Sequence, residues 1–330
     1  MARNLLIATM VATFAIGFVF GCSSDDEAAP GTAPAPDPTV GPAPPAAPPP
    51  GAALPALNLP PDAAPPPPVD AGPDVQPLDA DPGAGSGKLV YAVDVDGRLI
   101  SFRVNAPDKI SIQLVTGLQA GEKLLGIDFR PADGKMYGLG SSSRLYTVDR
   151  ATGAAAVVGD GTPFTPALAG QAHGFDVNPA ADKIRVHTDV DQNLRLDPVT
   201  GKVVASDGAL AFAAGDPNFG QSPNIVGTAY TNSVSPAPAT TTLYGIDSTR
   251  DLLVQLANPN DGQVSTLGTL GVDVDQVAGF DINGAGNTAY AILRVGAEVG
   301  FYTIDITSGA ASKAGTITYP LPLAGMAIEP

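Results

Sequence analysis

A short pattern recurs four times inside this 330-residue chain and occurs once more at its end. Each copy is a glycine followed by an apolar residue or Thr, then Asp or a small residue, and then another apolar residue. The copies are Gly126–Phe129, Gly174–Val177, Gly227–Tyr230, Gly279–Ile282 and Gly325–Ile328. Their glycines are 48, 53, 52 and 46 residues apart. That period is close to the 40–50 residues of a propeller blade, which is built from four strands.

Each repeat divides into four short apolar runs separated by turn residues. The unit that begins at Leu124 reads "LLGIDFRP", "KMYGLG", "RLYTVD" and "AAAVVGD". A turn with Asp or Asn first and Gly last recurs between the third and fourth runs, beginning at Asp149, Asp197, Asn258 and Asp305. Such side chains cap backbone N–H groups, and Gly tolerates positive φ. We therefore interpret these four residues as turn formers without a chemical role.

The two ends of the repeat region complement each other. The region opens at Lys88 with "KLVYAVDVDGRLISFRV", which matches second and third strands, and the chain closes with a first strand at Ala324–Pro330. Joined in space, the two ends complete one blade and remove exposed sheet edges, whereas an open solenoid would need atypical caps. The sequence predicts an all-β fold over residues 88–330. It is a five-bladed β-propeller with four-stranded blades, closed by the C-terminal strand joining the N-terminal blade.

The first 21 residues have the pattern of an export signal. Arg3 is followed by a charge-free apolar stretch, Leu5–Phe20, which is short for a membrane-spanning helix. "VFGC" at Val19–Cys22 resembles a bacterial lipoprotein signal, in which Cys22 would carry the lipid, although Val19 and Phe20 depart from the usual residues. An ordinary signal peptide with a chance cysteine and an uncleaved anchor are the alternatives. We expect an exported protein, lipid-anchored to a bacterial membrane in the cell envelope, with the outer membrane or cell surface favoured.

Residues 22–87 form a compositionally distinct segment. Residues 23–87 hold 20 of the 34 prolines and nine acidic residues, but no Lys, Arg or aromatic residue. Such a stretch has too little apolar bulk to offset chain entropy, and its proline runs favour extended polyproline II. The prediction is a disordered, acidic, Pro/Ala-rich linker, with a ligand for a proline-reading domain as the alternative.

The charge balance restricts the partners. Lys and Arg total 17 against 33 Asp and Glu, a net charge of −16. A protein that tracks phosphates needs clustered basic residues, so nucleic acid is not an expected partner. The expected partners are the membrane, through the lipid on Cys22, and an unidentified protein or glycan ligand.

Three repeats place an Asp at the same position of the first strand. These residues are Asp128, Asp176 and Asp281, and Ala229 and Ala327 stand in the other two copies. First strands surround the axis of a propeller, so the carboxylates should repel unless a cation, water or backbone donors offset them. We favour backbone N–H donors within or between blades, and hence no cofactor. An axial Ca²⁺ or polar ligand site is the alternative.

Other polar groups give weak signals. His187–Asn193 begins like a calcium loop, but Leu194 stands where Gly is needed, so a polar hairpin turn is favoured. His173 and His187 are the only histidines, which excludes a His-rich zinc site. Arg185 and Arg195 are expected to pair with a nearby Asp. No catalytic residue is predicted.

Several segments carry a family resemblance. "GFDVNPAADKIRVHTDVDQNLRLDPVTG", "GTAYTNSVSPAPATTTLYGIDSTRDLLVQLANPNDG" and "VAGFDI" resemble a bacterial exported domain known as domain of unknown function 4394. The resemblance covers essentially Lys88–Pro330 and implies a secreted, β-rich repeat domain. It brings no catalytic residues.

Two functions follow as hypotheses. The favoured one is a lipid-anchored envelope protein that displays a propeller for recognition or scaffolding, without evident catalysis, because fold alone does not imply function. The alternative is a metal-dependent lactonase or hydrolase with its site at the mouth of the propeller channel.

Overall fold

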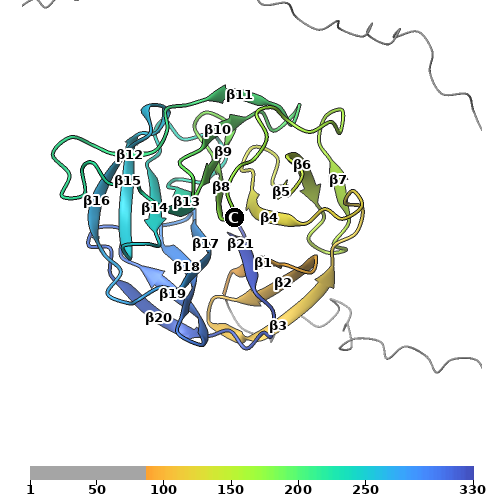
Figure 1. Cartoon of the computed structure of the whole chain (residues 1–330). Helices are drawn as coiled ribbons and strands as arrows, with labels where there is room; N and C mark the ends of the chain where they lie inside the picture. The colour runs from red at the N-terminus through yellow and green to blue at the C-terminus, as the bar shows by residue number, and fades with distance from the viewer. Residues whose placement is uncertain (1–86) are drawn as a thin grey trace, which may run out of the picture. The chain divides into compact units, whose positions relative to one another are not determined.

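Residues 87–330 of this computed structural model are described, and they form five mainly antiparallel sheets arranged as a ring (Figure 1). The predicted signal peptide, Cys22 and nearly all of the predicted linker lie outside the described residues. No helix within residues 87–330 has the length and apolar character needed to cross a membrane.

Four of the sheets have consecutive inner-to-outer strands, and we number the sheets as blades from the composite one. Blade 2 contains β4 (Leu124–Phe129), β5 (Met136–Gly140), β6 (Arg144–Val148) and β7 (Ala155–Val157). Blade 3 contains β8 (His173–Asn178), β9 (Lys183–Thr188), β10 (Asn193–Leu196) and β11 (Val203–Ser206). Blade 4 contains β13 (Ile225–Tyr230), β14 (Leu243–Asp247), β15 (Leu252–Asn258) and β16 (Gln263–Thr269). Blade 5 contains β17 (Gln276–Ile282), β18 (Ala289–Val295), β19 (Glu298–Ile304) and β20 (Ala311–Thr316).

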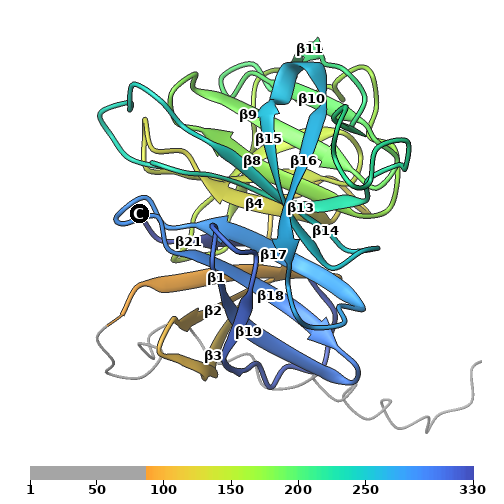
Figure 2. The same ribbon diagram turned by 90° about the vertical axis from the view of Figure 1, so that its left-hand side faces the viewer.

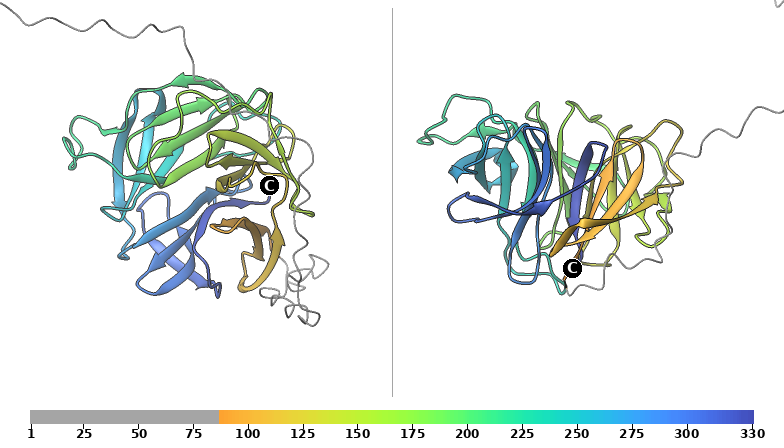
Figure 3. Two further views of the ribbon diagram at one scale, coloured as in Figure 1. Left: turned by 45° about the vertical axis from the view of Figure 1, so that its right-hand side comes forward. Right: turned by 90° about the horizontal axis from the view of Figure 1, so that it is seen from below.

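Blade 1 joins the two ends of the propeller, as predicted. Its strands are β21 (Leu323–Ile328), β1 (Leu89–Asp94), β2 (Arg98–Arg103) and β3 (Ala106–Leu114), in that order from the axis. The C-terminal strand pairs with β1 through Val90 opposite Ile328 and Ala92 opposite Met326. Figures 2 and 3 show β21 beside β1 from the side and from below. The expected closure by the C-terminal strand is thus present.

Blade 4 departs from the four-strand prediction. A short strand, β12 (Ala211–Phe212), pairs in parallel with β16 and makes blade 4 five-stranded. It belongs to the long connection from β11 to β13, which returns along the outer edge of blade 4. Leu210 and Phe212 are buried there against the core of that blade. The extra strand covers an edge that would otherwise present unpaired backbone groups.

The recurring turn is built as predicted in three blades. The side chains of Asp149, Asp197 and Asp305 each accept hydrogen bonds from the backbone N–H groups two and three residues ahead. The prediction is wrong for Asn258, whose side chain caps no N–H of the turn and instead donates to Gln263. There the turn is a 3-10 helix, η1 (Pro259–Asp261), with bonds to it from blade 3.

The glycine of the repeat has a steric cause. A Cβ on Gly126, Gly174 or Gly227 would lie 2.6, 2.7 or 3.0 Å from a side-chain atom of the next inner strand. The same clash with the next inner strand arises at Gly279 and Gly325. Five inner strands can converge this closely around one axis because the facing position lacks a side chain.

Candidate functional site

The three repeat carboxylates meet at the propeller axis. Asp128, Asp176 and Asp281 occupy equivalent positions in the middle of β4, β8 and β17, and all three are buried. One oxygen from each lies within 4.8 Å of the others. The structure therefore brings together the three predicted axial residues.

Together these carboxylates accept a hydrogen bond from one backbone N–H group on each of the five inner strands in the described part of the chain. Asp128 accepts from Phe129 and from Val177 of the next blade, both at 2.7 Å. Asp281 accepts likewise from Ile282 and from Ile328, both at 2.6 Å.

Asp176 completes the set with a single bond. Its Oδ1 accepts from Tyr230 N at 3.2 Å. Where the preceding blade has Ala at the axial position, the Asp of a blade therefore binds the N–H of its own inner strand. Each of the other three inner strands is bound by the Asp of the preceding blade. Bonds within and between blades are what the backbone-donor hypothesis describes.

Burial and mutual repulsion alter the acidity of this cluster. Burial, followed by the charge of Asp281, raises the pKa of Asp128 well above its usual range. Burial and the charges of Asp128 and Asp281 do the same to the pKa of Asp176. Burial raises the pKa of Asp281 to about 6. The cluster accordingly binds protons at a higher pH than free Asp side chains do.

We expect the axial carboxylates to contribute stability that grows as the pH falls from about 6 to about 4, because an unfolded Asp has a pKa near 3.9 and Asp281 therefore binds more protons in the folded state over this range. His187 opposes this gain, because its folded pKa of about 3 lies below the unfolded value near 6.5. Carboxyls with a lowered pKa, such as Asp182 and Asp305, contribute stability that is lost only below about pH 4.

The measurement is the urea midpoint across pH 4–8 in the presence of EDTA. Asp176→Asn keeps an oxygen acceptor for Tyr230 and leaves both histidines in place, so on acidification its midpoint should fall further than that of the unchanged protein. The same pH dependence in both proteins would contradict the expectation.

A second group of polar residues surrounds one mouth of the channel. A cavity of about 190 Å³ is lined by residues from all five inner strands, together with His173, Asp189, Asn224 and Asp275. Burial lowers the pKa of His173, and the charge of Asp189 opposes this. Asp189 accepts from Gln171 N, and the Oδ1 of Asn224 is buried without a partner among the described residues. The segment that resembled a calcium loop is the β9–β10 turn beside this cavity.

The interface between blades 3 and 4 differs from the other interfaces of residues 87–330. Hydrophobic clusters fill the interfaces between blades 1 and 2, 2 and 3, 4 and 5, and 5 and 1. On the face of each blade that meets the next, the residue opposite the axial Asp or Ala is tyrosine in four blades: Tyr91, Tyr137, Tyr244 and Tyr290. In blade 3 that residue is Arg185.

Polar residues also replace apolar ones at two neighbouring positions of blade 3. His187 occupies the place of Leu139, Ile246 and Ile292, opposite the repeat glycine. Asn193 pairs with His187 as Leu145 pairs with Leu139. Blade 3 therefore presents Arg, His and Asn where the other blades present apolar or aromatic side chains.

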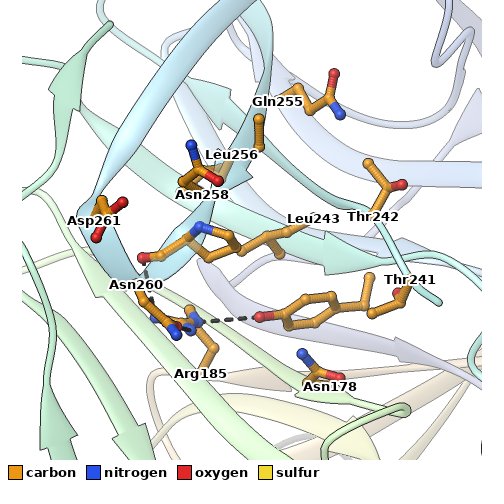
Figure 4. Close-up of a pocket in the computed structure, with 13 residues that line it drawn as sticks. Asn178, Arg185, Thr241, Thr242, Leu243, Gln255, Leu256, Asn258, Asn260 and Asp261 are labelled. Carbon is orange, nitrogen blue, oxygen red and sulfur yellow. Dashed lines mark hydrogen bonds between the residues drawn. The ribbon is translucent and has the colours of Figure 1, made fainter. Parts of the chain in front are cut away.

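Arg185 is held rigidly at this interface. Its Nε donates to the Tyr230 hydroxyl at 3.1 Å, and its Nη2 donates to Asn260 Oδ1 at 2.8 Å (Figure 4). Nη1 donates to Asn193 Oδ1 at 2.6 Å and to Asp207 Oδ2 at 2.8 Å. Asp207 also accepts from Arg195 at 2.7 Å, which confirms the predicted pairing of both arginines with a nearby Asp.

Two buried polar side chains beside Arg185 have atoms without hydrogen-bond partners among residues 87–330. They are both ring nitrogens of His187 and the Oγ1 of Thr228, on opposite sides of the interface. Burial and the Arg185 charge lower the pKa of His187 to about 3, so its ring is neutral. Native interiors rarely leave such groups unsatisfied, and polar atoms of this kind are characteristic of functional sites.

The interface opens into a cavity of about 460 Å³, within the range of about 300–1,000 Å³ typical of small-ligand sites. Arg185 and Asn178 form part of its wall, and η1, the end of β15 and the residues that lead into β14 form most of the rest (Figure 4). Tyr230 also lines the cavity. The other polar lining side chains are Asn178, Thr241, Thr242, Gln255, Asn258, Asn260 and Asp261.

The sequence interpretation missed this site, although the repeat contained the signal. The second-strand segments read "LVYAV", "KMYGL", "KIRVH", "TLYGI" and "TAYAI", and one of them has Arg in place of Tyr. Aligning the repeats at this tyrosine, in addition to the glycine, would have identified blade 3 as the exception.

The comparisons with known proteins agree with the fold. A family model described as "Domain of unknown function (DUF4394)" matches residues 98–327. The chain belongs to the DUF4394 family. The match spans the propeller except for β1 and the last residue of β21, so the repeat architecture is that of a DUF4394 domain. No curated protein matches the chain.

Solved structures similar to this DUF4394 protein share little sequence with it. One is a chain of a nidogen/laminin complex, with 12% identity and a TM-score of 0.42; 74% of this chain and 98% of that chain are covered. A protein of unknown function from Bacteroides thetaiotaomicron has 15% identity and a TM-score of 0.44, with coverage of 73% and 57%. TolB from Acinetobacter baumannii has 13% identity and a TM-score of 0.40, with coverage of 71% and 54%. Such distant similarities carry no argument about function.

Proposed function

We propose that this protein is a recognition module of the bacterial cell envelope, which binds a polar ligand between blades 3 and 4. One observation carries the proposal: the blade 3–4 interface has a buried Arg185 and an adjoining cavity where the other interfaces of the described chain have packed apolar residues. Polar groups cost stability when they replace an apolar core, so a functional reason is expected for them.

The cavity wall is suited to binding. Arg185 is fixed by Tyr230, Asn193, Asp207 and Asn260, so little entropy would be lost when it meets a ligand. The amide and hydroxyl groups around it supply both donors and acceptors, which suits a ligand rich in hydroxyl groups. A glycan of the envelope or its surroundings fits this chemistry.

We expect the protein to bind at least one glycan on an array of bacterial and host glycans, and Gln255→Ala to reduce the signal about tenfold. Gln255 lines the cavity and holds no other side chain in place. Gln221→Ala is the matched control, because Gln221 is exposed and lies outside the cavity. Equal binding by both variants, or binding to no glycan, would contradict the proposal.

The envelope location rests on the sequence of the first 22 residues. We expect Cys22→Ser to abolish lipid labelling and to release the protein from membranes, because the lipid would be the only remaining insertion device after signal cleavage. Fractionation of cells that express either form is the measurement. A variant that stays membrane-bound and unprocessed would indicate an uncleaved anchor instead.

A metal-dependent lactonase or hydrolase is the second candidate. Its support is the channel-mouth cavity, where Asp189 and Asp275 accompany Asn224, whose Oδ1 is buried and unpartnered. Each axial carboxylate lies three residues beyond a residue of its own strand that lines this cavity, which is about 10 Å along the strand. Metal analysis of the purified protein is the test. A stoichiometric divalent ion whose removal by EDTA lowers the melting temperature would favour the enzyme.

A further inference from the structure

The carboxylate nearest to Arg185 is shared between two arginines. Arg185 and Arg195 share one carboxylate, that of Asp207, at 2.8 and 2.7 Å. The side chains of Arg185 and Asp207 are only 3% and 7% exposed. The nearest negative charge on the lining itself is Asp261, which is exposed at the rim. Asp207 therefore divides its charge between the buried Arg185 and the partly exposed Arg195, and Arg185 is only partly neutralised.

The guanidinium of Arg185 also retains one donor. Its Nε donates to Tyr230, and one N–H of Nη2 donates to Asn260. The two N–H groups of Nη1 are shared among Asn193, Asp207 and the Pro259 carbonyl oxygen. The second hydrogen of Nη2 has no acceptor within residues 87–330, and Arg185 lines the cavity. An arginine that is buried, oriented and short of one acceptor is a strong partner for a carboxylate, because charge-assisted hydrogen bonds are about twice as strong as neutral ones.

The remaining lining groups are neutral. Asn178 comes from the end of β8, Gln255 from β15, and Asn258 from the last residue of that strand, so amides face the cavity from both blades. Thr241 and Thr242 add hydroxyls at the start of β14. Amide groups that both donate and accept match vicinal hydroxyls, which do the same.

We infer that this cavity binds an acidic sugar, with its carboxylate on Arg185 and its hydroxyls on the surrounding amide and threonine side chains. The inference rests on the proposed function and specifies its ligand class. The sugar carboxylate would complete the neutralisation of Arg185, because Asp207 is shared with Arg195. The exposed Asp261 opposes it from the rim and limits affinity.

The test is calorimetric titration of the full-length protein with D-galacturonate, its methyl ester and D-galactose. We expect D-galacturonate to bind at least tenfold more tightly than the methyl ester or galactose, because those two lack the charge. Tenfold corresponds to about 1.4 kcal/mol. Raising the salt concentration should weaken the binding of galacturonate and leave the binding of galactose unchanged.

The Asp261→Asn variant makes the test independent of folding at Arg185, and Arg185→Lys tests the arginine directly. Asp261→Asn removes the rim charge from an exposed side chain and should tighten galacturonate about two- to threefold without affecting galactose. Arg185→Lys keeps the charge, loses the planar fork, and should reduce the preference for the acid.

The outcomes separate this inference from the proposed function. Equal affinity for galacturonate, ester and galactose, sensitive to Gln255→Ala, would overturn the acidic-sugar assignment and leave the recognition cavity in place. Failure of all three sugars to bind would also overturn the assignment, and the glycan array would then decide the recognition proposal separately.

Discussion

Truncation of Ala324–Pro330 is expected to destabilise the whole propeller far more than the loss of seven residues suggests. The truncation removes all of β21 except Leu323, and with it most of the inner strand of blade 1 and the buried side chains of Met326 and Ile328. Burial of two such side chains is worth about 3–6 kcal/mol, against a typical total stability of about 5–15 kcal/mol. The deletion also removes the Ile328 N–H that Asp281 binds and leaves β1 as an open edge.

Urea unfolding and light scattering on the truncated and full-length proteins would measure this effect. We expect a much lower midpoint together with aggregation through the open edges. A deletion of the same length at residues 44–50, outside the propeller, is the control. A truncated protein that stays monomeric with an unchanged midpoint would show that the ring does not depend on its shared blade.

Gly279→Ala should have the second-largest effect, although it adds a single methyl group. The new Cβ would stand 2.6 Å from the backbone nitrogen of Met326 and 3.0 Å from the carbonyl carbon of Gly325. Backbone atoms cannot move aside as a flexible side chain can, so the inner strands of blades 5 and 1 must separate. Overpacking of this kind costs about 1–3 kcal/mol, and more where backbone must shift.

Gly271→Ala is the matched control for that substitution. Gly271 has a φ of 73°, but no atom lies within 4 Å of the position of its Cβ. Only the left-handed backbone penalty of about 1–2 kcal/mol applies there. If both variants lost the same stability by urea unfolding, close approach of the inner strands would not explain the repeat glycine.

The sequence predicted the ring because the information lies in a repeated local pattern. The alternation around Asp128 and the Asp149 turn have local physical causes. The glycine recurs because each inner strand meets the next in the same way, and the split blade follows from comparing the two ends. The extra strand β12 was not foreseen, since two residues that pair with an edge leave no periodic signal. The location of Cys22 and its lipid remains a prediction from the signal pattern alone.

The blade 3–4 cavity was harder to predict for a different reason. The sequence predicts that Arg185 and Arg195 form ion pairs with a nearby Asp, and Asp207 does bind both. A hairpin pattern does not say which face of a blade meets its neighbour, however, and Tyr230 and Asn260 reach Arg185 from a blade that is distant in sequence. That contact exists only after the ring has assembled.

The arrangement of axial carboxylates limits how such a ring could be recombined. Because an Asp can serve its own strand and the following one, an alanine blade is tolerated only when an Asp blade comes next. Blades 4 and 1 meet this condition, since Asp281 and Asp128 follow them. A duplicated copy of blade 4 inserted beside the original would place Ala229 next to its own copy, and one inner N–H would then have no acceptor. Blades of this protein are therefore not interchangeable units, because a blade with Ala at the axial position must be followed by a blade with Asp there.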